Sequence, residues 1–426
     1  MTSKNNRQHL VALDVGTSKV LCVVALTQGE EKEKKEKALR IVGMGCTSSA
    51  GIREGTVVDV EEAVTAIRRA VGEAQYTAGA GTITRVWAAI GGQTLTSCNC
   101  TGVAVLKGRE VTQEDVRIAS DNARVHARHE GHGREPIKLI PQGYACGDVA
   151  AVMNPIGLMG QKLEARMHAV YGSPTNAENL KRCIQRAGLE LVNYEPHPWA
   201  AAKGVLTPSE AICGAAVIDL GAQTTSILVM RENIVLYTHV LPWGADLLTR
   251  DLSVVLGLPL KESEQLKVHH GSCDLSAVVP GEILDVTLPA GEQNGASAHS
   301  IGSVACSRSL LVRTLNARVR ESFSLHKKLL MDSGLFDDRV QIVVLTGGGA
   351  KLPGIVEAAE AVFRKKVRIG RPIGIEGNSS VLKNPEAAVA AGLIRCADEA
   401  RTQGADALQS EPTFFERIKT IFIGDY

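Results

Sequence analysis

Short apolar runs separated by glycine-containing turns occur in both halves of the chain. Residues 10–26 read LVALDVGTSKVLCVVAL, two β-rich apolar runs around a Gly-Thr-Ser-Lys turn, and this pattern predicts a β-hairpin. The pattern returns at residues 214–230, GAAVIDLGAQTTSILVM, where Asp219 lies 205 positions after Asp14. Such a repeat favours a chain of two similar halves, although two unrelated hairpins would give the same pattern.

Helical and strand-like segments alternate along the rest of the chain. Residues 340–363, VQIVVLTGGGAKLPGIVEAAEAVF, predict a buried strand, a triple glycine and then a helix. Residues 84–168 combine strand-like runs with a helix that Thr112 caps, which predicts a small module set inside a larger domain. The charge-balanced run at 30–37, EEKEKKEK, predicts a solvated loop. Further helices are expected from Asp59, over 176–187 and over 306–331.

Composition excludes several classes of protein. The 426 residues are 44% apolar and 22% charged, which fits two or three globular domains and excludes general disorder. A net charge of +1 excludes a protein that mainly coats nucleic acid. The sequence has neither an apolar run long enough for a membrane-spanning helix nor the pattern of an export signal. Its ten cysteines form no CxxC pair, so we expect reduced thiols in a cytosolic protein.

Three glycine-containing turns follow apolar strands, where a backbone can approach a phosphate chain closely. Two aspartates at the strand ends, Asp14 and Asp219, are suited to hold Mg²⁺ mostly through its water molecules. No GxxxxGK[ST] motif is present, so a P-loop site is excluded. The candidate phosphate-contacting residues are Gly16, Thr17, Ser18 and Lys19 in the first turn, Gly221, Thr224 and Thr225 in the second, and Gly347, Gly348 and Gly349 in the third.

A histidine cluster is the main alternative site. His126, His129 and His132 are spaced by three, as metal ligands on a helix would be. Gly131 and Gly133 interrupt the helix there, and no carboxylate or cysteine framework supports a metal. No GxSxG or HExxH motif occurs.

The segments LDVGTSK, VIDLGAQTTS and LTGGGAKLPG resemble the two phosphate loops and the adenosine loop of the actin/Hsp70/sugar-kinase superfamily. Further segments, among them GIREGTVVD, KLIPQGYA, NPIGL and LKVHHGSC, resemble the FtsA family of bacterial cell-division proteins. The resemblance implies an α/β, actin-like, two-lobed ATPase fold with an inserted 1C-type subdomain. It also implies that Glu264 and Lys267 flank the nucleoside. The implied divisions are 1–83 and 169–198 (subdomain 1A), 84–168 (1C), 199–240 and 306–397 (2A), 241–305 (2B), 398–412 (linker) and 413–426 (amphipathic helix).

The resemblance also implies a function. Members of the family bind ATP and Mg²⁺, assemble into actin-like filaments, and anchor filaments of the tubulin-like protein FtsZ through its C-terminal tail. They do so at the division site, on the cytoplasmic face of the inner membrane, and they recruit later division proteins; here we expect residues 84–168 to contact those proteins.

The second loop departs from the usual Asp-x-Gly-Gly-Gly-Thr at Ala222 and Gln223, and Ser226 stands where an acid often lies. Because no general base is evident, no catalytic residue is assigned and at most slow ATP hydrolysis is expected.

The end of the chain predicts a membrane anchor. Five apolar residues lie on one face of a predicted helix over 413–426, with charged residues mainly on the others. A helix packed on the protein's own core would show the same pattern, but the polar stretch at 398–412 favours a separate segment. The five residues are Phe414, Phe415, Ile418, Ile421 and Phe422.

Other functions fit the same superfamily. A metabolite kinase would need a catalytic aspartate opposite the γ-phosphate, and a chaperone would need a further large substrate domain. A pilus-assembly adaptor of this fold would lack the amphipathic tail.

Overall fold

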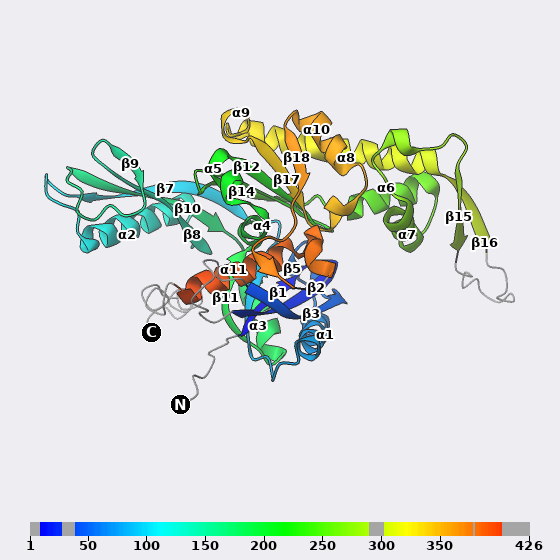
Figure 1. Cartoon of the computed structure of the whole chain (residues 1–426), viewed down its shortest axis with the longest axis horizontal. Coiled ribbons are helices and arrows are strands. Elements are labelled where there is room, and N and C mark those ends of the chain that lie inside the picture. The colour runs from blue at the N-terminus through cyan, green and yellow to red at the C-terminus, as the bar shows by residue number, and fades with distance from the viewer. Residues whose placement is uncertain (1–8, 28–38, 289–301, 378–379, 403–426) are drawn as a thin grey trace.

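The computed structural model describes residues 9–27, 39–288, 302–377 and 380–402. It has two stacked lobes, with one small domain extending from one end and a two-stranded hairpin at the other (Figure 1). The charge run at 30–37, most of the predicted linker and the amphipathic segment at 413–426 lie outside the described residues. Within them, no helix is both long enough and apolar enough to cross a membrane.

The first lobe contains a six-stranded sheet in the order β11-β6-β1-β2-β3-β19. Strands β1 and β2 are antiparallel and joined by a tight turn, as predicted for residues 10–26, and β6 runs parallel to β1. The strands are β1 (His9–Val15), β2 (Lys19–Thr27), β3 (Leu39–Ser48), β6 (Arg85–Ile90), β11 (Glu190–Pro196) and β19 (Ile375–Glu376). The lobe also contains the small hairpin β4 (Ile52–Arg53) and β5 (Thr56–Val57), helix α1 (Val60–Ala78), which Asp59 caps, and helix α3 (Pro174–Arg186).

The second lobe repeats this arrangement in a five-stranded sheet of order β14-β13-β12-β17-β18. Here β12 and β13 form the antiparallel hairpin, β14 follows β13, and β17 and β18 are parallel to β12. The same order and directions in both sheets confirm the two similar halves that the repeated hairpin predicted. The strands are β12 (Ala215–Leu220), β13 (Thr225–Arg231), β14 (Ile234–Leu241), β17 (Ile342–Thr346) and β18 (Lys366–Ile369).

Two helices rich in small residues join the lobes. Helix α4 (His197–Val205) contacts strands of both sheets, and α11 (Ala388–Thr402) crosses α4 and covers β1, β2 and β6. The backbones meet so closely at the crossing that a Cβ atom on Gly392 would lie 1.7 Å from the Ala200 carbonyl oxygen. The prediction that 388–397 belongs to the second lobe is therefore wrong, since this helix packs on the first-lobe sheet. The predicted linker also begins later than residue 398, because α11 continues to Thr402.

The second lobe contains the remaining helices, which lie on both faces of its sheet. They are α5 (Pro208–Cys213), α6 (Asp246–Leu256), α7 (Leu260–His270), α8 (Arg308–Asp332), α9 (Phe336–Arg339) and α10 (Ile355–Phe363). The projecting hairpin pairs β15 (Ile283–Leu288) with β16 (Gly302–Ser307). Short 3₁₀ turns cover Leu275–Ala277, Gly348–Lys351, Ser380–Lys383 and Pro385–Ala387.

The inserted domain is a four-stranded sheet, β7-β10-β8-β9, covered by helix α2 (Figure 1). It interrupts the connection between β6 and α3. Its predicted start at residue 84 is too early, because β6 pairs with β1 and β11 in the first-lobe sheet. Its end is also later than residue 168, because β10 is continuous to Tyr171. The elements are β7 (Thr96–Val105), α2 (Gln113–Glu130), β8 (Lys138–Cys146), β9 (Val149–Val152) and β10 (Lys162–Tyr171).

The histidine cluster on α2 has a structural explanation at one position. The ring Nδ1 of His126 lies 3.0 Å from the Thr101 carbonyl oxygen and 3.3 Å from the Thr101 backbone nitrogen, so the ring covers polar backbone groups at the outer edge of β7. Among the described residues, no group of three or more histidine, cysteine or acidic side chains is arranged to hold a metal.

Hydrogen bonds connect the inserted domain, which interrupts the chain of the first lobe, to the second lobe. His168 of β10 lies between two polar partners, with its Nδ1 2.7 Å from Asn99 Oδ1 and its Nε2 2.9 Å from Thr238 Oγ1. Ser97 exchanges two hydrogen bonds with the Thr238 backbone, and Gln142 donates to the Val235 carbonyl at 2.6 Å. Since Thr238 and Val235 belong to β14, this network joins the insert to the edge of the second-lobe sheet.

This contact predicts a pH-dependent stability. Burial lowers the pKa of His168 from 6.5 to about 4, so the unfolded chain takes up a proton that the folded chain resists. The free energy of unfolding should therefore fall by about 2 kcal/mol from this residue as the pH drops from 7 to 5. Urea unfolding at both pH values should show a smaller fall for His168→Gln than for the wild type. His126→Gln, at a half-exposed position, is the control, and parallel pH dependences for wild type and His168→Gln would contradict the prediction.

Candidate functional site

A cavity of about 390 Å³ lies between the two lobes. It collects residues from the ends of both hairpins, from the glycine turn after β17 and from helix α7. Every predicted nucleotide-site residue except Thr225 lines it. Those residues are Asp14, Gly16, Thr17, Ser18, Lys19, Asp219, Gly221, Thr224, Glu264, Lys267, Gly347, Gly348 and Gly349.

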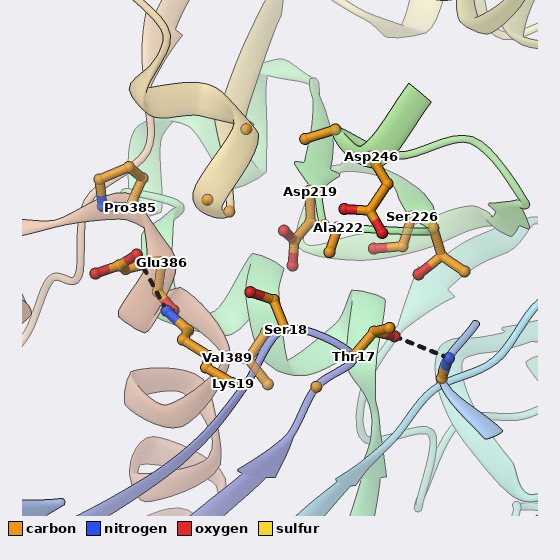
Figure 2. Close-up of a pocket in the computed structure, with 18 of the residues that line it drawn as sticks. Thr17, Ser18, Lys19, Asp219, Ala222, Ser226, Asp246, Pro385, Glu386 and Val389 are labelled. Carbon is orange, nitrogen blue, oxygen red and sulfur yellow. Dashed lines mark hydrogen bonds and ion pairs between the residues drawn. The ribbon is translucent and has the colours of Figure 1, made fainter. Parts of the chain in front are cut away.

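The two hairpin turns have the same internal geometry. The backbone N–H of Gly16 donates to the Lys19 carbonyl, and that of Gly221 donates to the Thr224 carbonyl, each at 3.0 Å. Each turn therefore closes across four residues and presents its glycine to the cavity. The Thr17 hydroxyl accepts a hydrogen bond from the Gly55 N–H at 3.2 Å, which fixes the first turn against the β4–β5 hairpin (Figure 2).

Two buried carboxylates face the cavity from opposite lobes. His197, the first residue of α4, lies between them, with its Nδ1 3.5 Å from Asp219 Oδ2 and its Nε2 3.9 Å from Asp14 Oδ1. Burial raises the pKa of Asp219 and nearby Asp14 raises it further, whereas His197 and Lys19 lower it. A cation beside Asp219 would stabilise its ionised form.

The carboxylates suit Mg²⁺, which prefers hard oxygen ligands and keeps several of its waters. The Oδ1 atom of Asp14 is buried and has no hydrogen-bond partner among the described residues, so it is available to a metal-bound water. The pair therefore fits the magnesium ion that the sequence predicted.

The third glycine turn packs directly against one of these acids. Gly347 has φ +84°, and a Cβ atom there would lie 2.1 Å from Asp219 Oδ1. Only glycine can occupy this position without displacing the carboxylate. The turn then continues through Gly348 and Gly349, which form one wall of the cavity.

Lys19 reaches the cavity but has a protein partner there. Its ammonium group donates to the Glu386 carbonyl at 3.0 Å and lies 3.3 Å from the Glu386 carboxylate (Figure 2). Glu386 also lies 3.6 Å from Lys351 of the third turn. The positive charge of Lys19, which we predicted to bind phosphate, is therefore partly balanced by the Glu386 carboxylate, which contacts both the first and the third glycine turns.

At the other end of the cavity, Glu264 and Lys267 form an ion pair on α7 at 2.6 Å. Lys267 also donates to the Ala245 carbonyl at 3.1 Å and to Thr249 Oγ1 at 2.8 Å. These contacts join α7 to the start of α6, so the two predicted residues contribute a polar wall with fixed positions.

Thr225 does not reach the cavity, which corrects the prediction. Its side chain is buried on the opposite face of β13, where its hydroxyl donates to the Trp243 carbonyl. The next residue, Ser226, pairs with Asp219 across the hairpin and lines the cavity instead. Successive side chains of a strand point to opposite faces, so a shift of one residue decides which hydroxyl faces the site.

Other lining residues escaped the sequence analysis. His197 and Glu386 lie far from the glycine turns in sequence, and no local motif marks either. Gly91 and Gly92 also line the cavity, directly after β6. Their position in the first sheet matches that of Gly347 after β17, so aligning the two halves would have identified them.

The comparisons with known proteins agree with this architecture. A family model described as "Cell division protein FtsA" matches residues 216–392, and one described as "SHS2 domain inserted in FTSA" matches residues 92–171. The second match covers the inserted domain as the structure delimits it, from just after β6 to the end of β10.

Solved structures share the fold at low sequence identity. One of a PilM–PilN type IV pilus biogenesis complex has a TM-score of 0.61 and 15% identity, and covers 91% of this chain and 98% of that one. MreB5 of Spiroplasma citri bound to ADP has a TM-score of 0.52 and 13% identity, and covers 93% of this chain and 99% of that one. The fold is therefore that of actin-like ATPases.

Curated relatives match along nearly their whole length. The cell division protein FtsA of Neisseria meningitidis serogroup B is 34% identical over 397 residues, which are 92% of this chain and 91% of the relative. That of Escherichia coli K12 is 29% identical over 417 residues, 97% of this chain and 96% of the relative. Since the match includes both lobes and the insert, this chain belongs to the FtsA family of cell division proteins.

Proposed function

We propose that this protein binds ATP with Mg²⁺ between its lobes and anchors filaments of the tubulin-like division protein FtsZ to the cytoplasmic membrane. One observation carries the nucleotide part of the proposal. Three glycine turns and two buried acids, which are widely separated in sequence, converge on one cavity. The membership of the FtsA family supports the role in division.

The proposed binding mode assigns each wall of the cavity a task. Asp14 and Asp219 hold the metal from opposite sides, and the ion supplies positive charge to the phosphates. The turns at Gly16 and Gly221 offer backbone N–H groups to the phosphate oxygens. The nucleoside occupies the end formed by Lys267 and Gly348. Closure of the lobes around the nucleotide then sets the surfaces through which copies of the chain assemble into filaments.

The membrane part of the proposal depends on residues 413–426. Burying the five apolar side chains of this segment gains roughly 10 kcal/mol before ordering costs, at about 2 kcal/mol each. Helix formation and immobilisation remove much of that gain, so one segment attaches weakly and reversibly. A filament presents many segments at once, and their combined attachment is much stronger. The partners proposed are therefore the FtsZ C-terminal tail, further copies of this chain, the lipid bilayer and other division proteins that contact the insert.

The two acids give the first test of this function. Asp14→Ala and Asp219→Ala should each weaken Mg²⁺-dependent binding of a fluorescent ATP analogue more than tenfold, because each removes one side of the metal site. Chelating Mg²⁺ should weaken wild-type binding to a similar extent and remove the difference between wild type and variants. Asp121→Ala, at a half-exposed acid of α2 far from the cavity lining, is the matched control. Wild-type affinity in both cavity variants would refute the proposed metal site.

The tail gives the second test. Removal of residues 413–426, or Phe415→Glu, should abolish flotation of the protein with vesicles of phosphatidylethanolamine and phosphatidylglycerol, because a charge on the apolar face opposes insertion. Thr420→Ala, on a polar face, should leave flotation unchanged. FtsZ should float with the vesicles only when the intact protein is present. Undiminished flotation of the truncated protein would exclude this segment as the anchor.

A further inference from the structure

One glutamine of the second phosphate loop joins the two lobes. Gln223 Oε1 accepts a hydrogen bond from the backbone N–H of Glu54 at 2.9 Å, and its Nε2 donates to Asp246 Oδ2 at 3.1 Å. Glu54 belongs to the turn between β4 and β5 in the first lobe, whereas Gln223 and Asp246 belong to the second. A single side-chain amide therefore connects the two lobes beside the cavity, which the neighbouring residues Gly55 and Ala222 line.

Contacts within the first lobe position the turn that contains Glu54, independently of Gln223. Glu54 and Gly55 both have positive φ values, 50° and 73°, and form the tight turn between β4 and β5. Asn176 of α3 binds the hairpin on both sides, donating to the Gly55 carbonyl at 3.1 Å and accepting from the Val57 N–H at 3.2 Å. Thr17 adds the contact with the Gly55 N–H described above. The Glu54 N–H is thus a donor with a fixed position on the first lobe.

The second-lobe partner is equally well positioned. Asp246 is the first residue of α6, and its backbone N–H donates to the Ala222 carbonyl at 2.8 Å. Its carboxylate lines the cavity opposite the first phosphate loop (Figure 2). Asp246 therefore holds one end of the Gln223 amide on its own lobe and directs the other end across the gap.

We propose that Gln223 is an interlobe latch, a positioning residue that holds the cleft closed and slows the release of bound nucleotide. The side chain must accept on one side and donate on the other, and a primary amide does both. Gln223 and its two partners, Glu54 and Asp246, are all half-buried, so water competes only partly for their hydrogen bonds. The part of the proposal that concerns nucleotide rests on the proposed function, whereas closure of the cleft does not require nucleotide.

The latch is tested first in nucleotide-free protein. Gln223→Met preserves the length of the side chain and removes both hydrogen bonds. We expect hydrogen–deuterium exchange at the Glu54 amide to become about three- to tenfold faster, the effect of losing one or two such bonds. Gln113→Met, at an exposed glutamine of the insert, should leave this exchange unchanged. Wild-type exchange at Glu54 in the Gln223→Met variant would overturn the latch.

Exchanging the amide and carboxylate groups of Gln223 and Asp246 distinguishes the loss of their hydrogen bond from a general loss of structure. Gln223→Glu keeps the acceptor for the Glu54 N–H but places a carboxylate against Asp246, so exchange at Glu54 should accelerate. Combining it with Asp246→Asn restores one donor and one acceptor across the pair, and should return the exchange to the wild-type rate. If the double variant does not recover the wild-type exchange rate, the hydrogen bond between residues 223 and 246 is not what protects the Glu54 amide.

The second measurement concerns nucleotide. In stopped-flow experiments, a fluorescent ATP analogue should leave Gln223→Met about three- to tenfold faster than wild type, with a smaller change in its rate of entry. Faster exchange at Glu54 with an unchanged release rate would overturn the role in nucleotide retention. If the wild type binds no nucleotide, the proposed function fails, whereas the exchange experiments still decide whether Gln223 holds the lobes together.

Discussion

The burial of two carboxylates side by side, one from each lobe, is the constraint on which the site depends. Asp14 and Asp219 each lie one residue before the end of the first strand of a hairpin, and both are buried on either side of the His197 ring. Two ionised acids in such a place repel each other and lose hydration. A positive charge between the two carboxylates would offset both costs. The glycine turns bring backbone N–H groups rather than side chains to the same space, which leaves room for a ligand.

Besides the helices α4 and α11, two sets of hydrogen bonds cross from one lobe to the other. The insert leaves the first lobe after β6, yet His168 and its neighbours hydrogen-bond to β14 of the second. On the other side of the cleft, Gln223 reaches from the second lobe to Glu54 of the first. A rotation of the lobes must therefore either carry the insert with it or break the β14 contact. A change in the cleft that keeps the β14 contact therefore also moves the insert.

The close approach of the lobes depends on small side chains. The protein has only 4% aromatic residues, and alanine and glycine form the crossing of α4 with α11. Such helices pack with their backbones almost in contact, so a larger residue at Gly392 would push the crossing apart. Since α4 also begins with His197, the same crossing sets the position of that ring in the cavity.

The sequence by itself determined the repeated hairpins, the three glycine turns and the two acids, because strand periodicity and turn chemistry are local properties. Glu264 and Lys267, which the resemblance predicted to flank the nucleoside, line the same cavity. Only the tertiary structure decided that β6 belongs to the first-lobe sheet and that α11 returns to that lobe, since sheet pairing and helix docking depend on distant residues. It likewise decided that Ser226 rather than Thr225 faces the site, and it brought in His197 and Glu386 from elements that no local motif connects to the loops. The roles of these residues arise from three-dimensional proximity, which a pattern along one chain does not encode.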